Sequence, residues 1–108
     1  MAEQWARKHF VPVGGQNDSI RVRLTTRRGV LVYYTAQYEI WIEDDWRPAV
    51  RYDNAHGRPH RDLLDWDGRT VAKEPLPDLP PNRALAAAIN EVKLQWSQFR
   101  ADFLGRRR

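Results

Sequence analysis

An alternating run at residues 30–43 constrains the fold of this chain most strongly. Along one parity almost every side chain is apolar or aromatic: Val30, Val32, Tyr34, Ala36, Tyr38, Ile40 and Ile42. A period of two places side chains on opposite faces of a β-strand, so this parity is predicted to face a core. Fourteen residues is long for one strand, and a bulge or strong twist is therefore expected near residues 35–37.

Further strand and turn patterns lie on both sides of this run. Residues 20–25 alternate apolar and polar side chains, which predicts a half-buried strand with a basic outer face. Residues 27–29 and the segment 43–46, which has three acidic residues, are expected to form turns. A third strand is predicted through Val50 and Tyr52, and Pro48 indicates an edge position or a late start for it.

The middle of the chain predicts two more strands. Residues 53–59 are rich in turn formers and are expected to be a loop. Asp67-Gly68, flanked by apolar residues, favours a type I′ hairpin between a fourth strand and a short fifth. Four of the seven prolines fall in residues 74–81, which are predicted to be an extended linker.

The two ends of the chain differ in their patterning. Residues 1–18 are expected to be loosely ordered, with Trp5 and Phe10 attached to the body and a loop at residues 14–18. Residues 82–104 predict an amphipathic helix, with Asn82 as its N-cap and Gly105 as its stop. Its apolar stripe is formed by Leu85, Ile89, Val92, Trp96, Phe99 and Phe103.

Together these patterns predict a single α+β domain spanning residues 1–108. The expected architecture is a curled antiparallel meander of four to five strands, with the C-terminal amphipathic helix packed on one face. A coiled-coil seam is the alternative use of the stripe. It is disfavoured because the stripe is short and rich in bulky aromatic residues. Trp96→Ala is accordingly expected to lower the melting temperature sharply.

Composition narrows the classes of function. The chain has 108 residues, no cysteine and a net charge of +4. The absence of cysteine excludes disulfide scaffolds, thiol chemistry and cysteine-ligated zinc. No signal peptide and no membrane-spanning segment is evident, so a cytoplasmic protein is expected. A pI near 9.8 is compatible with an acidic partner such as RNA.

The candidate site is the segment of residues 51–62, which contains two of the three histidines. A metal-free ribonuclease needs a base, an acid and cations that bind phosphate. His56 and His60 are the candidate acid and base, since imidazole titrates near neutrality. Asp53 or Asp62 would orient a histidine. Arginines in the segment are candidate phosphate ligands: Arg51, Arg58 and Arg61.

Simpler explanations exist for the same residues. Asp53, Asn54 and Gly57 are ordinary turn formers, and an exposed loop histidine is usually only solvated. A sparse metal site is also conceivable from His56 and His60 with one aspartate, but cysteine ligands are lacking. No metal and no cofactor is therefore expected.

The sequence Tyr52-Asp53-Asn54-Ala55-His56-Gly57-Arg58-Pro59-His60-Arg61-Asp62 resembles the TumE-like toxins of bacterial toxin–antitoxin pairs. A preceding meander and a following helix with Trp96 and Phe99 add to the resemblance. The family typically has two histidines one residue apart; here His60 matches the first, and Asp62 replaces the second. The resemblance implies an RNA-cleaving or otherwise growth-inhibiting protein with a cognate antitoxin, or a non-toxic relative.

Two other functions are consistent with the sequence. A non-catalytic module could bind nucleic acid or protein through a basic strip that includes Arg21 and Arg23, near exposed Tyr33 and Trp41. These arginines could instead pair with acidic residues at positions 39 and 43–45. A subunit of a larger assembly is the other possibility, including a homodimer formed through the open sheet face or an edge strand.

Overall fold

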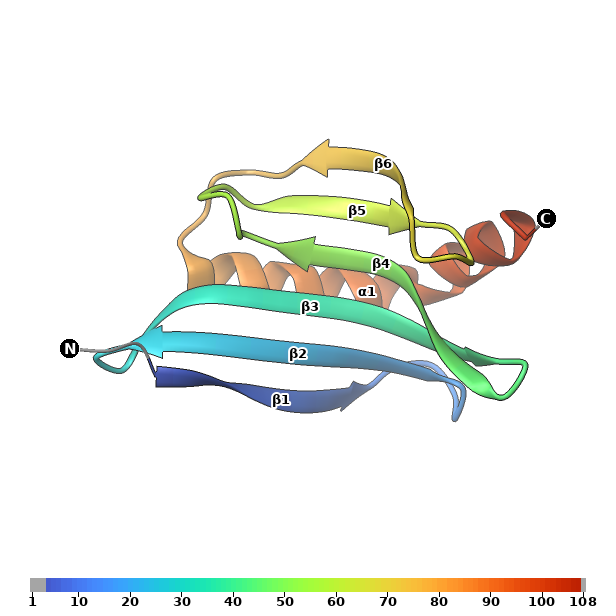
Figure 1. Cartoon of the computed structure of the whole chain (residues 1–108), viewed down its shortest axis with the longest axis horizontal. Coiled ribbons are helices and arrows are strands. Elements are labelled where there is room, and N and C mark those ends of the chain that lie inside the picture. The colour runs from blue at the N-terminus through green and yellow to red at the C-terminus, as the bar shows by residue number, and fades with distance from the viewer. Residues whose placement is uncertain (1–3, 108) are drawn as a thin grey trace.

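The computed structural model describes the backbone of residues 4–107 and the side chains of residues 11–107. A single antiparallel sheet runs in chain order from β1 to β6, and one helix, α1, crosses behind β3 and β4 (Figure 1). The elements are β1 (Gln4–Pro12), β2 (Asp18–Arg27), β3 (Val30–Ile42), β4 (Asp45–Asp53), β5 (His60–Leu64), β6 (Thr70–Pro75) and α1 (Pro81–Gly105). The predicted α+β meander with a C-terminal helix is confirmed.

The strand count is six rather than four or five, because the N-terminal segment forms β1. β1 pairs with β2 in antiparallel register from Gln4↔Thr26 to Pro12↔Ser19. The expectation of a loosely ordered segment is wrong for residues 4–12. Such pairing uses main-chain groups on the edge of β2, so it does not need an alternating apolar pattern. The side chains of Trp5 and Phe10 lie outside the described residues.

The predicted core parity of β3 is confirmed over its central part. Tyr34, Ala36, Tyr38 and Ile40 are at most 3% exposed, whereas Val30 at the hairpin end is 64% exposed. The strand continues without interruption through residues 35–37, where a bulge or strong twist was expected.

The pairing of β3 is irregular instead at two other positions. The register with β2 skips Val32, and the register between β3 and β4 skips Ala49. β4 is an interior strand, but its pairing with β5 covers only Val50–Asp53, so Pro48 lies beside this second bulge on a stretch of β4 paired with β3 alone. The predicted edge position is therefore confirmed locally, whereas the strand does not start late, since β4 begins at Asp45. A bulge disrupts the hydrogen-bond ladder locally, and this is where an interior strand can accept proline.

Two of the hairpin turns are of type I′, but the turn that was predicted to be of this type is not. Arg28-Gly29 and Glu43-Asp44 have positive φ at both residues, as a two-residue type I′ turn requires. Between β5 and β6, Gly68 N donates to Asp65 O over 3.0 Å, and only Gly68 of the Asp67-Gly68 pair has positive φ. This is a type I turn followed by a glycine bulge, so the predicted type I′ turn is wrong.

Helix α1 begins one residue earlier than predicted. Pro80 is the N-cap and makes no side-chain cap bond, so the assignment of Asn82 as cap is wrong. Pro81 takes the first helical position, where its missing N–H costs nothing. The helix packs Val92 and Phe103 fully into the core, and the other stripe residues contact it while partly buried. The described helix has no segment both long and apolar enough to cross a membrane.

Candidate functional site

The register of β4 with β5 sorts the candidate residues between the two faces of the sheet. Tyr52 lies opposite Arg61, and Asp53 lies opposite His60. Tyr52 faces α1, since its hydroxyl donates to Glu91 of the helix. Successive side chains alternate, so Asp53, His60 and Asp62 project from the face that the helix leaves open.

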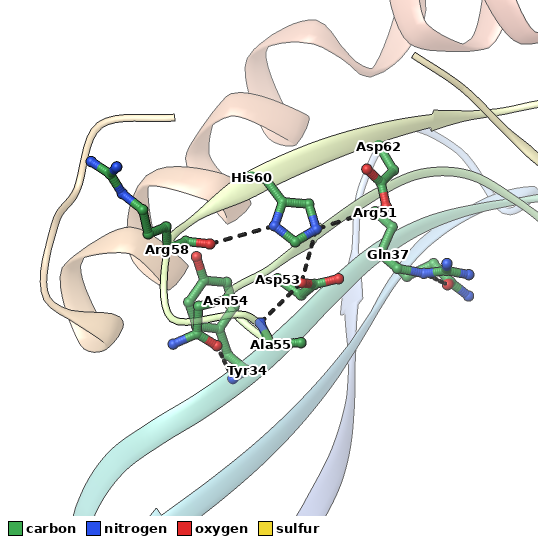
Figure 2. Close-up of polar contacts among 9 residues, drawn as sticks. All are labelled: Tyr34, Gln37, Arg51, Asp53, Asn54, Ala55, Arg58, His60 and Asp62. Carbon is green, nitrogen blue, oxygen red and sulfur yellow. Dashed lines mark hydrogen bonds and ion pairs between the residues drawn. The ribbon is translucent and has the colours of Figure 1, made fainter. Parts of the chain in front are cut away.

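His60 is surrounded by three acceptor oxygens. Its Nε2 lies 3.0 Å from Oδ1 of Asp53 and 3.8 Å from Oδ2 of Asp62, while Nδ1 lies 3.4 Å from the carbonyl oxygen of Arg58. Figure 2 shows both carboxylates on the Nε2 side of the ring and the carbonyl on the other side. The side chains of His60, Asp53 and Asp62 are only 12%, 14% and 9% exposed.

This arrangement restricts what His60 can do. A neutral imidazole has one N–H, whereas both ring nitrogens here face acceptors. Asp53 is the nearer partner, at 3.0 Å from Nε2, whereas the Arg58 carbonyl is a long contact for Nδ1 at 3.4 Å. Oδ1 of Asp62 is buried and has no hydrogen-bond partner within the described part of the chain.

Asn54 fixes the turn that follows Asp53. Its Oδ1 accepts a hydrogen bond from Tyr34 N at 3.1 Å, and its Nδ2 donates to the carbonyl of Val32, the bulged residue of β3, at 3.0 Å. Asp53 Oδ1 also accepts from Ala55 N at 3.1 Å. Asn54 is buried and serves as a bridge between strands. Burial, with a smaller effect from the Asp53 charge, raises the pKa of Tyr34 to about 12.

A hollow of about 440 Å³ lies between the β4–β5 loop and β6. His56, Arg58 and Lys73 are exposed at this hollow, and His60 lines it as well. The rings of His56 and His60 are nearly parallel, with centroids 6.4 Å apart and an interplanar angle of 18°. Lys73 was not among the predicted site residues. Its place depends on the pairing of β6 with β5, where it lies opposite Asp62.

Arg61 is not part of this cluster, contrary to its predicted role in phosphate binding. Its Nε lies 2.8 Å from Glu74 Oε1, and its Nη1 is hydrogen-bonded to Glu91 on the helix side of the sheet. Burial lowers the pKa of Arg61, but hydrogen bonds to the two carboxylates outweigh this effect and raise it overall. Tyr52 shares Glu91, so Arg61 ties the sheet to α1.

The other predicted arginines lie on the open face. Arg51 donates through Nε to Gln37 Oε1 at 2.9 Å, and Arg21 Nε lies 3.6 Å from Glu39 Oε2. The alternative in which Arg21 pairs with an acidic residue is therefore confirmed at Glu39. Arg23 is exposed. Glu39 thus places one carboxylate among the arginines of this face.

Exposed aromatic residues accompany these charges. Tyr33 is 44% exposed and Trp41 39% exposed. Trp41 contacts Trp46 edge-on, with ring centroids 5.5 Å apart. The predicted exposure of these two aromatic residues is confirmed.

Comparison with known families adds one finding. The family described as Domain of unknown function (DUF7718) matches residues 3–108. The chain belongs to the DUF7718 family. No curated protein and no solved structure matches it significantly. The DUF7718 description states no activity and gives no link to the TumE-like toxins.

Proposed function

We propose that this DUF7718 chain is a toxin-like ribonuclease that binds an RNA phosphate in the hollow beside the β4–β5 loop. The observation that carries the proposal is the pair of imidazoles, His56 and His60, lining one hollow together with Arg58 and Lys73. Two imidazoles supply a base and an acid, and two cations stabilise the charge that develops on phosphorus-bound oxygens.

The surroundings of the two rings support a division of roles between them. His56 is exposed at the rim and acts as the base. His60, as an imidazolium, directs Nε2–H to Asp53 and has only a long 3.4 Å contact at Nδ1. The proton on Nδ1 is therefore the easier one to transfer. Asp53 orients the ring of the acid.

The proposed reaction is an internal transesterification. His56 removes the proton of the ribose 2′-hydroxyl, and the 2′-oxygen forms a bond to phosphorus. The bond from phosphorus to the 5′-oxygen breaks, and that oxygen takes the proton from Nδ1 of His60. The products are a 2′,3′-cyclic phosphate and a 5′-hydroxyl. Arg58 and Lys73 neutralise the non-bridging oxygens.

The test is cleavage of a labelled single-stranded RNA by the purified protein in EDTA. We expect His56→Ala and His60→Ala each to reduce the rate by about 10²–10⁴-fold, as for loss of a proton-transfer group. Lys73→Ala should lower the affinity for RNA and make that affinity less dependent on salt. Lys93 is an exposed lysine on α1, so Lys93→Ala serves as the matched control. Intact RNA after incubation with the wild-type protein would overturn the proposal.

The result also separates cleavage from binding alone. If RNA binds with equal affinity to wild-type protein and to both histidine variants but is never cut, the chain is a binding module. In cells, the toxin-like proposal expects expression to arrest growth and His60→Ala to relieve the arrest. Growth unaffected by the wild-type protein contradicts the toxin-like part.

A further inference from the structure

The three side chains around Nε2 of His60 point to a second property of the open face. We propose that Asp53, His60 and Asp62 form a binding site for one divalent transition-metal ion, of the Mn²⁺ or Zn²⁺ type. One ligand atom from each residue lies within 4.8 Å of the other two. Two carboxylate oxygens and one imidazole nitrogen are ligands that such ions accept.

The distances fit a metal without rearrangement of the backbone. Around an ion bound at about 2.1–2.2 Å in octahedral geometry, neighbouring ligand atoms lie about 3 Å apart and opposite ones about 4.3 Å. Nε2 of His60 is 3.0 Å from Asp53 Oδ1 and 3.8 Å from Asp62 Oδ2. Both distances fall within the range from about 3 Å to about 4.3 Å, so small side-chain rotations suffice to bring the three ligand atoms around one ion.

Asp62 supplies an independent reason to expect a cation. The residue is 6% exposed overall, and its Oδ1 is buried without a hydrogen-bond partner among the residues described. An unpaired buried carboxylate oxygen is costly. A proton on Nε2 satisfies Asp53 Oδ1 at 3.0 Å, but Oδ2 of Asp62 lies 3.8 Å away, beyond hydrogen-bonding distance, and Oδ1 of Asp62 still has no partner among the residues described. A metal ion at the centre would contact both carboxylates.

The neighbouring basic side chains in the described part of the chain do not pair with the Asp62 carboxylate. Arg51 on β4 and Lys73 on β6 lie opposite Asp62 in the strand pairing. Arg51 instead directs its Nε to Gln37, and Lys73 is exposed. Within the described chain, neither forms an ion pair with the Asp62 carboxylate.

The positions of the three residues in the sheet make the site rigid. His60 and Asp62 are two residues apart on β5 and share its open face, while Asp53 lies opposite His60 on β4. Ligands on paired strands are positioned more accurately than ligands on loops. Mg²⁺ and Ca²⁺ favour oxygen-only ligand sets, so an imidazole ligand favours Mn²⁺ or Zn²⁺ over them.

Metal binding would also affect the proposed chemistry. An ion on Nε2 takes the place of the proton that His60 shares with Asp53, so the metal-bound and imidazolium forms exclude each other. RNA cleavage should therefore decrease as Mn²⁺ or Zn²⁺ is added. This consequence rests on the proposed function, whereas binding of the metal alone does not.

The experiment is titration of EDTA-treated, desalted protein with Mn²⁺ or Zn²⁺, followed by calorimetry and, for Mn²⁺, by electron paramagnetic resonance. We expect one ion per chain, with an affinity at least tenfold lower in Asp53→Asn and in Asp62→Asn. Asp67→Asn, at an exposed aspartate in the β5–β6 turn, is the matched control and should bind as the wild type does. The melting temperature without metal shows whether each variant is folded.

The outcomes separate the two proposals. Absence of binding at millimolar metal, or equal binding by both site variants and the wild type, overturns the metal site. A metal-dependent rise in melting temperature that is lost in Asp62→Asn supports it. RNA cleavage without metal binding rejects the metal site alone. Metal binding by a protein that never cuts RNA rejects the ribonuclease alone.

Discussion

The loop that joins β1 to β2 makes a close contact with helix α1 at Gly14. Gly14 has a φ of +59°, and a Cβ placed there would lie 2.9 Å from two ring atoms of Trp96 and 3.0 Å from Asp18 Oδ2. Cβ atoms in proteins essentially never approach other atoms so closely. The structure therefore predicts that Gly14→Ala is destabilising through both backbone strain and steric overlap.

The two contributions can be separated with a second glycine. A left-handed conformation costs a residue with a Cβ about 1–2 kcal/mol, and overpacking costs about 1–3 kcal/mol. Gly14→Ala should therefore lower the free energy of unfolding by about 2–5 kcal/mol. Gly29 has a φ of +79°, and a Cβ placed there would have no neighbouring atom within 4 Å, so Gly29→Ala should lose only the backbone part, about 1–2 kcal/mol.

Urea denaturation followed by circular dichroism gives the required free energies. Trp96→Ala should lower the free energy of unfolding by itself. In the Trp96→Ala background, Gly14→Ala should lower this free energy by little more than Gly29→Ala does, because the indole ring that the new Cβ would meet is absent. In thermal melts, each kcal/mol corresponds to about 4–8 °C for a domain of about this size. Equal losses for Gly14→Ala and Gly29→Ala in the wild-type background would refute the contact between this loop and the helix.

Three further predictions concern polar groups in the core and at its border. Asn54→Ala should lower the free energy of unfolding in urea by about 2–4 kcal/mol, since it leaves Tyr34 N and a β3 carbonyl without partners; wild-type stability would exclude the bridging role. Glu91→Gln should destabilise by about 1 kcal/mol or less, because Arg61 keeps Glu74, and the loss should shrink in high salt. With the pKa of Tyr34 raised from 10.0 to about 12, the unfolded chain loses this proton first, so stability should fall between these pH values by up to about 1.4 kcal/mol per unit. Tyr34→Phe should reduce that slope in denaturation curves measured at several pH values.

The sequence predicted the elements that depend on side-chain periodicity. The buried parity of β3 and the apolar stripe of α1 follow from periods of two and 3.6, and both are confirmed by burial of residues such as Tyr38 and Val92. It did not predict β1, which is stabilised by pairing to the edge of β2, or the bulges at Val32 and Ala49. Pairing and bulges depend on contacts with another strand, which local patterns do not encode.

The candidate site shows the same division. The sequence identified the segment and its histidines, since both lie within twelve residues. It placed Arg61 with them, but alternation along β5 turns Arg61 toward Glu91 and the helix. It missed Lys73, which reaches the hollow only through the pairing of β6 with β5. Register between strands, rather than residue content, decides which side chains meet.

The strand register also places Asp62 on the same face of β5 as His60. Where the TumE-like pattern has a second histidine, this chain has a carboxylate two residues after His60 on the same face of β5. A histidine there would be a second proton-transfer group, whereas Asp62 contributes negative charge beside Asp53. In the proposed mechanism proton transfer is left to His56 and His60, and in the proposed metal site the pair of aspartates binds the cation beside His60. Asp62→Asn therefore discriminates between the two uses: it removes the carboxylate charge, so it should weaken Mn²⁺ binding, and in EDTA it should leave RNA cleavage intact. Unchanged Mn²⁺ binding by this folded variant would show that the carboxylate is not a ligand.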